Sequence, residues 1–368
     1  MQSNKVFLSG YYGMQNSGDD ALLMSTALGA KRFLNADSLA ISSPTRVKLP
    51  MLDAFAPALA ERQNFRGENR FRHLVSAAKA NRIIFGGGSV LHCPSDIHMK
   101  RAMMKLAGKG PHMAIGVGVG PFYTSAAEKA CAKFLNECHY IGVRDEESFD
   151  IATALAPSAN IEMTFDIAPM LIDYIPEDPI NTVQRRGIGV ALCPKERLHG
   201  NPDAEQERLR AIATALTTAS RESGEPVFLI DLNGHATLGD ANVHNELRSY
   251  LPKDIPVFTV PYNSNPLRLM ERLRHLRVVI GMRLHASILS YMVDTPVLSL
   301  NYHSKCVGWC DQIGMPNAYR FDTQHIDGHV MGDVLSRGLQ HGFAMPRLST
   351  ADAYRAARKN FEHGAVNS

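Results

Sequence analysis

Short apolar runs alternate with amphipathic segments along most of the chain. Runs such as VFLS, RIIF, MAIGV and YIGV each end at a glycine, proline or charged residue and precede a segment with helical periodicity. Strands that alternate with helices are typical of βαβ units, whose strands pair in parallel. The hydrophobic pattern therefore predicts an α/β fold built on parallel sheets.

This alternation is interrupted at residues 168–187. The sequence there, APMLIDYIPEDPINTVQRRG, carries three prolines and several charges, which disfavour regular elements. A second strand–helix series begins with GIGVALCP, and an amphipathic segment from about Thr350 predicts a C-terminal helix. We predict two Rossmann-like domains, 1–175 and 176–368, which face a cleft.

Composition narrows the range of functions. The 368 residues include 39 basic and 36 acidic side chains, for a net charge of +3, so the chain lacks the strong basic excess of a nucleic-acid-binding protein. A local cationic pocket for a small anion remains compatible with this balance. The six cysteines show no CxxC spacing, and we predict neither a disulfide framework nor a metal site.

The N-terminal sequence MQSNKVFLSG lacks the basic and apolar regions of a signal peptide. No apolar run reaches the roughly 18 residues that would span a bilayer. We therefore expect a cytoplasmic protein. Peripheral contact with the inner face of the membrane stays open, as does the oligomeric state.

The glycine-rich stretch LSGYYGMQNSGDDALL follows the first predicted strand. Its glycines match neither the GxGxxG dinucleotide pattern nor a P-loop. Asp19 or Asp20 stands where the N-cap of the next helix is expected. Amide and carboxylate groups beside glycines suit a sugar better than a pyrophosphate, which two acidic groups would repel. We therefore predict that Asn16, Gly18, Asp19 and Asp20 contact a sugar.

Two further loops follow strands of the first series. In FGGGSVLH, consecutive glycines let a ligand approach the backbone, so Gly87, Gly88 and Ser89 are candidate contacts; Ser89 could equally cap the next helix. In GVRDEES, Arg144 ends a strand and Asp145 begins a helix. Arg144 would either face the predicted cleft or pair with the acidic residue beside it. The loop GVGVGP lacks polar side chains and indicates tight packing.

The most informative segment is VVIGMRLHASILSYMVDTPVLSLNYHSK. A buried strand ends at Gly281, and Arg283 and His285 follow it at the start of a helix. Helix N-termini attract anions, and a guanidinium binds phosphate or carboxylate with two donors. His285 is placed to transfer protons or contact a phosphate oxygen, and Lys305 would extend the cationic pocket.

These motifs resemble the polysaccharide pyruvyl transferase family. GYYGMQNSGDDALL, GGGSVLH, GVRDEES, TFDIAP and the segment ending in NYHSK occur in the family's order across nearly the whole chain. The resemblance implies a GT-B-like architecture, with domain 1–175 on the acceptor side and domain 176–368 on the donor side. It also implies transfer of the pyruvyl unit of phosphoenolpyruvate to a polysaccharide sugar or its lipid-linked precursor, as a cyclic ketal without a redox cofactor.

The resemblance also implies roles for particular side chains. His285 would act as acid or base or contact phosphate, Arg283 and Arg144 would bind the donor's anionic groups, and Asp19 could serve as base. Where relatives carry an arginine after the first strand of the second domain, this chain has ALCPKERLHG. Cys193 takes that place, and Lys195 or Arg197 could substitute for the arginine.

Two alternatives stay open at this stage. A GT-B-type glycosyltransferase or a sugar-nucleotide epimerase would use the same helix N-terminus for a nucleotide sugar, with Asp231 as the ribose contact. A non-catalytic carbohydrate-binding protein would keep the fold without the chemistry. The loop DLNGHATLGD adds Asp231, His235 and Asp240 as further acceptor contacts, unless it is simply a solvated loop.

Overall fold

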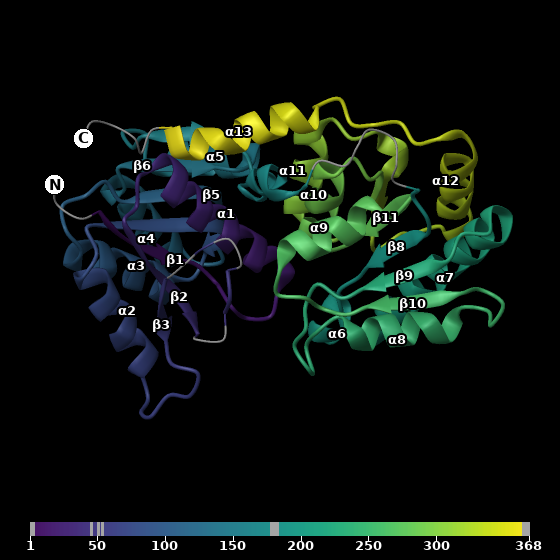
Figure 1. The fold of residues 1–368 in the computed structure, drawn as a ribbon, viewed down its shortest axis with the longest axis horizontal. Coiled ribbons are helices and arrows are strands. Elements are labelled where there is room, and N and C mark those ends of the chain that lie inside the picture. The colour runs from purple at the N-terminus through teal and green to yellow at the C-terminus, as the bar shows by residue number, and fades with distance from the viewer. Residues whose placement is uncertain (1–3, 45–46, 50–51, 53–54, 177–183, 363–368) are drawn as a thin grey trace. The chain divides into compact units, whose positions relative to one another are not determined.

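The computed structural model of the chain describes residues 4–44, 47–49, 52, 55–176 and 184–362. Contacts within the chain divide it into two compact units (Figure 1). The first unit comprises residues 1–14, 19–171 and 351–368, and the second comprises residues 15–18 and 172–350. The sequence-based division at 175/176 is therefore close to one junction, but it assigned residues 351–368 to the second domain and residues 15–18 to the first.

The first unit contains a seven-stranded sheet in the order β3-β2-β1-β4-β5-β6-β7, with every neighbouring pair parallel. Its strands are β1 (Lys5–Ser9), β2 (Ser38–Pro44), β3 (Ala56–Leu59), β4 (Arg82–Leu91), β5 (Met113–Val119), β6 (Tyr140–Val143) and β7 (Ile161–Met163). The connecting helices are α1 (Ser17–Phe33), α2 (Glu68–Ala78), α3 (Pro94–Leu106), α4 (Ser125–Glu137) and α5 (Glu146–Leu155).

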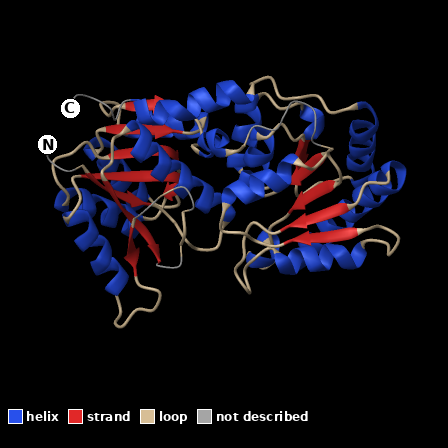
Figure 2. Ribbon diagram, viewed as in Figure 1, coloured by secondary structure: helices blue, strands red, loops and turns tan. Residues whose placement is uncertain are grey.

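The second unit contains a six-stranded parallel sheet in the order β10-β9-β8-β11-β12-β13. Its strands are β8 (Ile188–Ala191), β9 (Val227–Ile230), β10 (Val257–Val260), β11 (Val278–Gly281), β12 (Val297–Asn301) and β13 (Arg320–Asp322). Its helices are α6 (Lys195–Leu198), α7 (Pro202–Ser223), α8 (Ala241–Tyr250), α9 (Pro266–Arg274), α10 (Leu284–Met292), α11 (Ser304–Ile313) and α12 (Gly328–His341). The strands in red and helices in blue of Figure 2 show that each unit is a helix-covered sheet.

Numbered within its own unit, each sheet starts with the strand order 3-2-1-4-5-6 of the Rossmann fold. Apolar side chains on the strands pack against the helices to form one buried core in each unit. The central strands β4, β5, β8 and β11 are buried on both faces, which explains their uninterrupted apolar sequences. The prediction of two Rossmann-like α/β units is confirmed.

Some elements differ from the sequence prediction. The alternation did not reveal β2, β3, α3 and β7 of the first unit or α6, α11, β13 and α12 of the second, because these elements are short or begin in polar sequence. The glycines of GGGS belong to β4, which continues to Leu91 with a register shift rather than ending before them. The 3₁₀ helix η1 (Ala168–Tyr174) lies in the predicted boundary stretch, while residues 177–183 of that stretch lie outside the described residues.

The predicted C-terminal helix is α13 (Thr350–Glu362), and its last turn packs on the first unit. Asn360 is fully buried and accepts hydrogen bonds from Gly116 N at 2.8 Å and Thr164 Oγ1 at 3.0 Å. Its amide nitrogen donates to Phe165 O at 3.0 Å. These bonds cross most of the sequence, which explains why a helix at the chain's end belongs to the first compact unit.

All six cysteines are free thiols in the structure. Among the helices that the structure describes, none has the length and apolar character to cross a bilayer.

Candidate active site

Strand order locates the candidate site in each unit. In a Rossmann sheet, ligands bind beyond the carboxyl ends of the strands at the point where the strand order reverses. That point lies between β1 and β4 in the first unit and between β8 and β11 in the second. The segments that follow β1, β8 and β11 contain about half of the side chains predicted from the sequence, while Gly87, Gly88 and Ser89 belong to β4 itself.

Three neighbouring strands of the second unit bring cations to one edge of the sheet. Lys195 follows β8, Arg283 follows β11 and Lys305 follows β12. The ammonium groups of Lys195 and Lys305 lie 5.3 Å and 5.4 Å from the centroid of the Tyr302 ring, and Lys195 Nζ also donates to the Tyr302 carbonyl. We call Lys195, Arg283 and Lys305 the cation cluster; the prediction had grouped these three residues as donor contacts.

Asp240 fixes the orientation of Arg283. Nε of Arg283 lies 3.1 Å from Asp240 Oδ1, and Nη2 donates to the same carboxylate. Asp240 is fully buried and also accepts from the backbone N–H groups of Leu232 (3.0 Å) and Asn233 (2.9 Å). Nη1 of Arg283 makes no hydrogen bond to the described residues.

Two opposing effects act on the charge of Arg283. Burial disfavours the charged guanidinium, but the Asp240 carboxylate and, more weakly, Cys193 and Tyr302 outweigh it and raise the pKa of Arg283. Arg283 therefore stays protonated. The interpretation of DLNGHATLGD as a solvated loop is wrong for Asp231 and Asp240, which are both buried, and holds for residues 235–238, which include His235 and are exposed.

A second buried pair holds the loop after β8. His244 Nδ1 lies 2.6 Å from Asp231 Oδ1, and His244 Nε2 accepts from Leu192 N at 3.0 Å. Because Nε2 is an acceptor, the proton is on Nδ1 and is donated to Asp231. Leu192 precedes the buried Cys193, so the pair fixes the backbone that leads to Lys195. The side chain of Arg197, the other predicted substitute, lies outside the described residues.

His285 lies in the first turn of α10 and is half-buried. Its imidazole packs against Gly18, where a Cβ would lie only 2.3 Å from His285 Nδ1. Gly18 is part of the segment Gln15–Gly18, which joins the second unit through Ser17 N donating to Leu232 O (2.8 Å) and Gly234 N donating to Gln15 O (2.9 Å). The most specific N-terminal motif is thus in contact with the histidine.

The start of α1 corrects one detail of the prediction. Helix α1 begins at Ser17, and Asn16 Oδ1 accepts from Gly18 N at 3.0 Å. Asn16 therefore caps the helix, whereas Asp19 and Asp20 lie in its first turn. Asp20 is buried. The four residues predicted to contact a sugar thus separate into Asn16 and Gly18 on the second unit and Asp19 and Asp20 in the first.

Gly18→Ala is expected to displace His285 and to lower turnover by about ten- to a hundred-fold, the scale on which misplaced catalytic groups reduce rates. Alanine favours helices more than glycine does, so the change in helix propensity should not lower the thermal midpoint of unfolding. In a His285→Ala background, Gly18→Ala should change turnover little, because the displaced group is absent. Equal losses in both backgrounds would show that Gly18 acts independently of His285.

The switch point of the first unit contains a cavity of about 510 Å³. It begins at the carboxyl ends of β1 and β4, and the predicted residues Asp19, Gly88 and Ser89 line it. Polar residues that the sequence analysis missed complete the wall: His73, His92, Asp96 and Lys100. Desolvation lowers the pKa of His73 and of Lys100. The imidazole, carboxylate, ammonium and hydroxyl groups around the cavity provide hydrogen-bond donors and acceptors, which suits a polyhydroxylated ligand.

Arg144 is buried in the first unit rather than exposed. Its Nη2 donates to Ser89 Oγ at 3.0 Å, and Nη1 donates to Asp166 Oδ2 at 3.2 Å. The acidic neighbour Asp145 caps α5 by accepting from Ser148 N at 2.8 Å, and it lies 3.6 Å from Arg144 Nε. Arg144 therefore holds Ser89 at the first cavity, and the motifs GVRD and TFDIAP meet there.

The GGGS glycines have structural reasons for their presence. Gly87 adopts φ 66°, and a Cβ there would lie 2.7 Å from the Leu22 side chain of α1. Gly88 lies at the edge of the cavity. Ser89 does not cap α3, which begins at Pro94 after Cys93. Of the two readings of Ser89, the helix cap is wrong.

Solved structures share this fold. The chain matches UDP-GlcNAc 2-epimerase from Neisseria meningitidis bound to UDP-GlcNAc with a TM-score of 0.61 and 11% identity, over 96% of each chain. The epimerase from Methanocaldococcus jannaschii gives a TM-score of 0.60 and 10% identity, over 96% of this chain and 98% of that one. Trehalose-6-phosphate synthase OtsA gives 0.57 and 12%, over 99% and 97%. These likenesses confirm the GT-B-like fold.

A family comparison adds information about the sequence itself. The model of the family named polysaccharide pyruvyl transferase matches residues 16–304. This range contains both Gly18 and His285, together with Lys195 and Arg283 of the cation cluster, and it ends one residue before Lys305.

Proposed function

The chain belongs to the polysaccharide pyruvyl transferase family, and we propose that it transfers the pyruvyl group of phosphoenolpyruvate to a sugar. The acceptor would be part of a polysaccharide or of its lipid-linked precursor, and the product would be a pyruvate ketal. Phosphoenolpyruvate is a co-substrate in this proposal, and no further cofactor is needed for the bonds that change.

The observation that supports this donor most strongly is the cation cluster. Phosphoenolpyruvate carries a phosphate and a carboxylate, so it requires several fixed positive charges. Lys195 and Lys305 are point charges beside Tyr302, and Arg283 directs Nη1 away from its bonds to Asp240. The first turn of α10 adds backbone N–H groups and the partial positive charge of a helix N-terminus.

The proposed reaction balances with these groups. C3 of the donor takes a proton and becomes a methyl group, while a sugar hydroxyl loses its proton and attacks C2. The C2–O bond to phosphate breaks, a second hydroxyl attacks C2, and its proton leaves on inorganic phosphate. His285 is the proposed proton donor or phosphate contact. Asp19, which follows Gly18 in the chain and lines the first-unit cavity, is the proposed base for a hydroxyl.

Product analysis tests this proposal directly. The protein is incubated with phosphoenolpyruvate and a panel of free and lipid-linked glycans, and both phosphate release and the mass of the glycans are followed. We expect phosphate release that depends on one acceptor, together with the mass of an added pyruvate ketal on that acceptor. Phosphate release without a modified glycan, or transfer of a sugar from a nucleotide sugar, would contradict the proposal.

A nucleotide-sugar enzyme of the same fold is less well supported. It would use Asp231 as the ribose contact, but this carboxylate is buried and already accepts from His244 at 2.6 Å. The likeness to epimerases and to OtsA concerns the fold alone. Binding of a nucleotide sugar must therefore be measured beside binding of phosphoenolpyruvate to distinguish the two functions.

A further inference from the structure

The segment before and within α2 exposes aromatic rings among cations. Phe65 and Phe71 are 58% and 60% exposed, although large apolar side chains are usually buried. Arg62, Arg66 and Arg70 are exposed beside them and form no ion pair with the described residues. We call these five residues the basic–aromatic surface. None of them contributes to the candidate active site.

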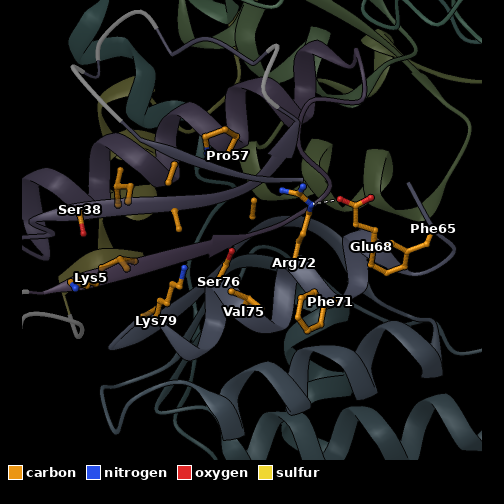
Figure 3. Close-up of a pocket in the computed structure, with 16 residues that line it drawn as sticks. Lys5, Ser38, Pro57, Phe65, Glu68, Phe71, Arg72, Val75, Ser76 and Lys79 are labelled. Atoms are coloured by element: carbon orange, nitrogen blue, oxygen red, sulfur yellow. Dashed lines mark hydrogen bonds and ion pairs between the residues drawn. The ribbon is translucent and has the colours of Figure 1, made fainter. Parts of the chain in front are cut away.

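This surface borders an apolar groove in the first unit (Figure 3). The groove has a volume of about 680 Å³ and lies between α2 and the sheet edge formed by β1, β2 and β3. Apolar side chains, among them Leu39, Pro57 and Val75, form its walls, and both exposed phenylalanines line it. In Figure 3, the rings of Phe65 and Phe71 lie at one end of the groove beside the Arg72–Glu68 pair.

Charge around the groove is predominantly positive. Lys5, Arg72 and Lys79 line it together with one acid, Glu68. Glu68 is engaged, because its Oε1 accepts from Arg72 Nε at 2.8 Å and its Oε2 accepts from Asn64 N. Lys5 and Lys79 make no ion pair with described residues, so cations without a counter-charge surround an apolar groove on a chain whose net charge is only +3.

We propose that the basic–aromatic surface and its groove dock the protein on an anionic phospholipid bilayer. Aromatic rings enter the boundary between head groups and acyl chains, while arginines and lysines bind lipid phosphates. The apolar walls of the groove favour this occupant over a nucleic acid, which needs polar groups to receive base edges or a continuous basic track. Exposed apolar patches rimmed by polar residues mark sites of interaction with proteins or membranes.

This inference deepens the proposed function, because a lipid-linked acceptor would be presented at such a membrane face. It does not depend on the chemistry, since membrane binding is measured without either substrate. If the protein binds vesicles but transfers no pyruvyl group, the proposed function alone is refuted. If it transfers the pyruvyl group but does not bind vesicles, docking alone is refuted.

Vesicle sedimentation tests the docking. The full chain is mixed with vesicles of phosphatidylcholine alone or of phosphatidylcholine with phosphatidylglycerol, at low and high salt. We expect binding only to the anionic vesicles, weakened by salt. Arg62→Glu with Arg66→Glu should weaken it by about ten-fold or more, since each cation near such a surface contributes roughly five-fold. Phe65→Ser with Phe71→Ser should weaken it by about ten-fold or more.

Matched controls use exposed positions of the same unit. Lys129→Glu changes the net charge by the same amount per site, and Tyr123→Ser removes a ring that is 86% exposed; neither should change vesicle binding. Unchanged thermal midpoints would show that all variants fold. No binding to anionic vesicles, equal losses in the controls, or stronger binding to a single-stranded oligonucleotide than to vesicles would each overturn the proposal.

Discussion

Replacing His285 by alanine is expected to lower turnover of phosphoenolpyruvate by about 100-fold to 10,000-fold, the range for a positioned acid or base. The side chain lies in the first turn of α10, after a buried strand, and Gly18 packs against its imidazole. Such a close contact restricts the ring to a narrow range of orientations. The rate of phosphate release with a saturating acceptor measures the effect.

A second substitution separates proton transfer from binding. His285→Gln keeps a hydrogen-bonding group but cannot exchange protons near neutral pH. If His285 transfers a proton, this variant should be nearly as slow as alanine while its KM for phosphoenolpyruvate stays close to that of the wild type. A raised KM with an unchanged kcat would assign His285 to phosphate binding, and an unchanged rate in both variants would reject any role in the reaction.

Arg283→Met is expected to have the largest effect on stability, with a loss of about 3–5 kcal/mol, because it leaves a buried carboxylate without its cation. Asp240 is fully buried, and among the described residues it would keep the backbone donors Leu232 N and Asn233 N. Thermal or denaturant unfolding of the purified variant measures the loss. The double variant Arg283→Met with Asp240→Asn should recover part of it, because the unpaired charge is removed.

Lys305→Met is the control for this prediction. Lys305 belongs to the same cluster, and its ammonium group lies over the Tyr302 ring, whereas Arg283 is paired with the buried Asp240. We expect its unfolding free energy to change by less than about 0.5 kcal/mol, as for most surface substitutions, while the KM for phosphoenolpyruvate rises. Equal destabilisation by the two substitutions would mean that the Arg283–Asp240 pair has no special structural role.

The sequence predicts the central strands of both sheets better than the short strands at their edges and the helix that joins the first unit from the chain's end. Buried parallel strands such as VVIG and IIF are apolar throughout, and the helices between them have clear periodicity, so two Rossmann-like units were predictable. The short strands β2 and β3 lie next to polar and proline-containing sequence, where no periodicity develops. The contribution of α13 to the first unit depends on Asn360, whose partners are about 200 residues away and leave no local signal.

The candidate site was predictable only in part, for a related reason. Arg283, His285 and Lys305 follow strands, and their position at strand ends marked them. Asp240 and the His244–Asp231 pair come from a loop and a helix whose polar residues look solvated in the sequence, yet all three are buried. The partners of Gly18 and Arg144 also depend on long-range packing, so the sequence indicated their importance but not what they contact.

The central claim is that the cation cluster binds phosphoenolpyruvate, and a calorimetric titration tests it most directly. Phosphoenolpyruvate and UDP-GlcNAc are each titrated into the wild type and into the variant Lys195→Met with Lys305→Met. The account predicts saturable binding of phosphoenolpyruvate to the wild type, at least about ten-fold weaker binding to the variant, and no binding of UDP-GlcNAc. Binding of UDP-GlcNAc without phosphoenolpyruvate, or equal affinity of both proteins for phosphoenolpyruvate, would contradict it.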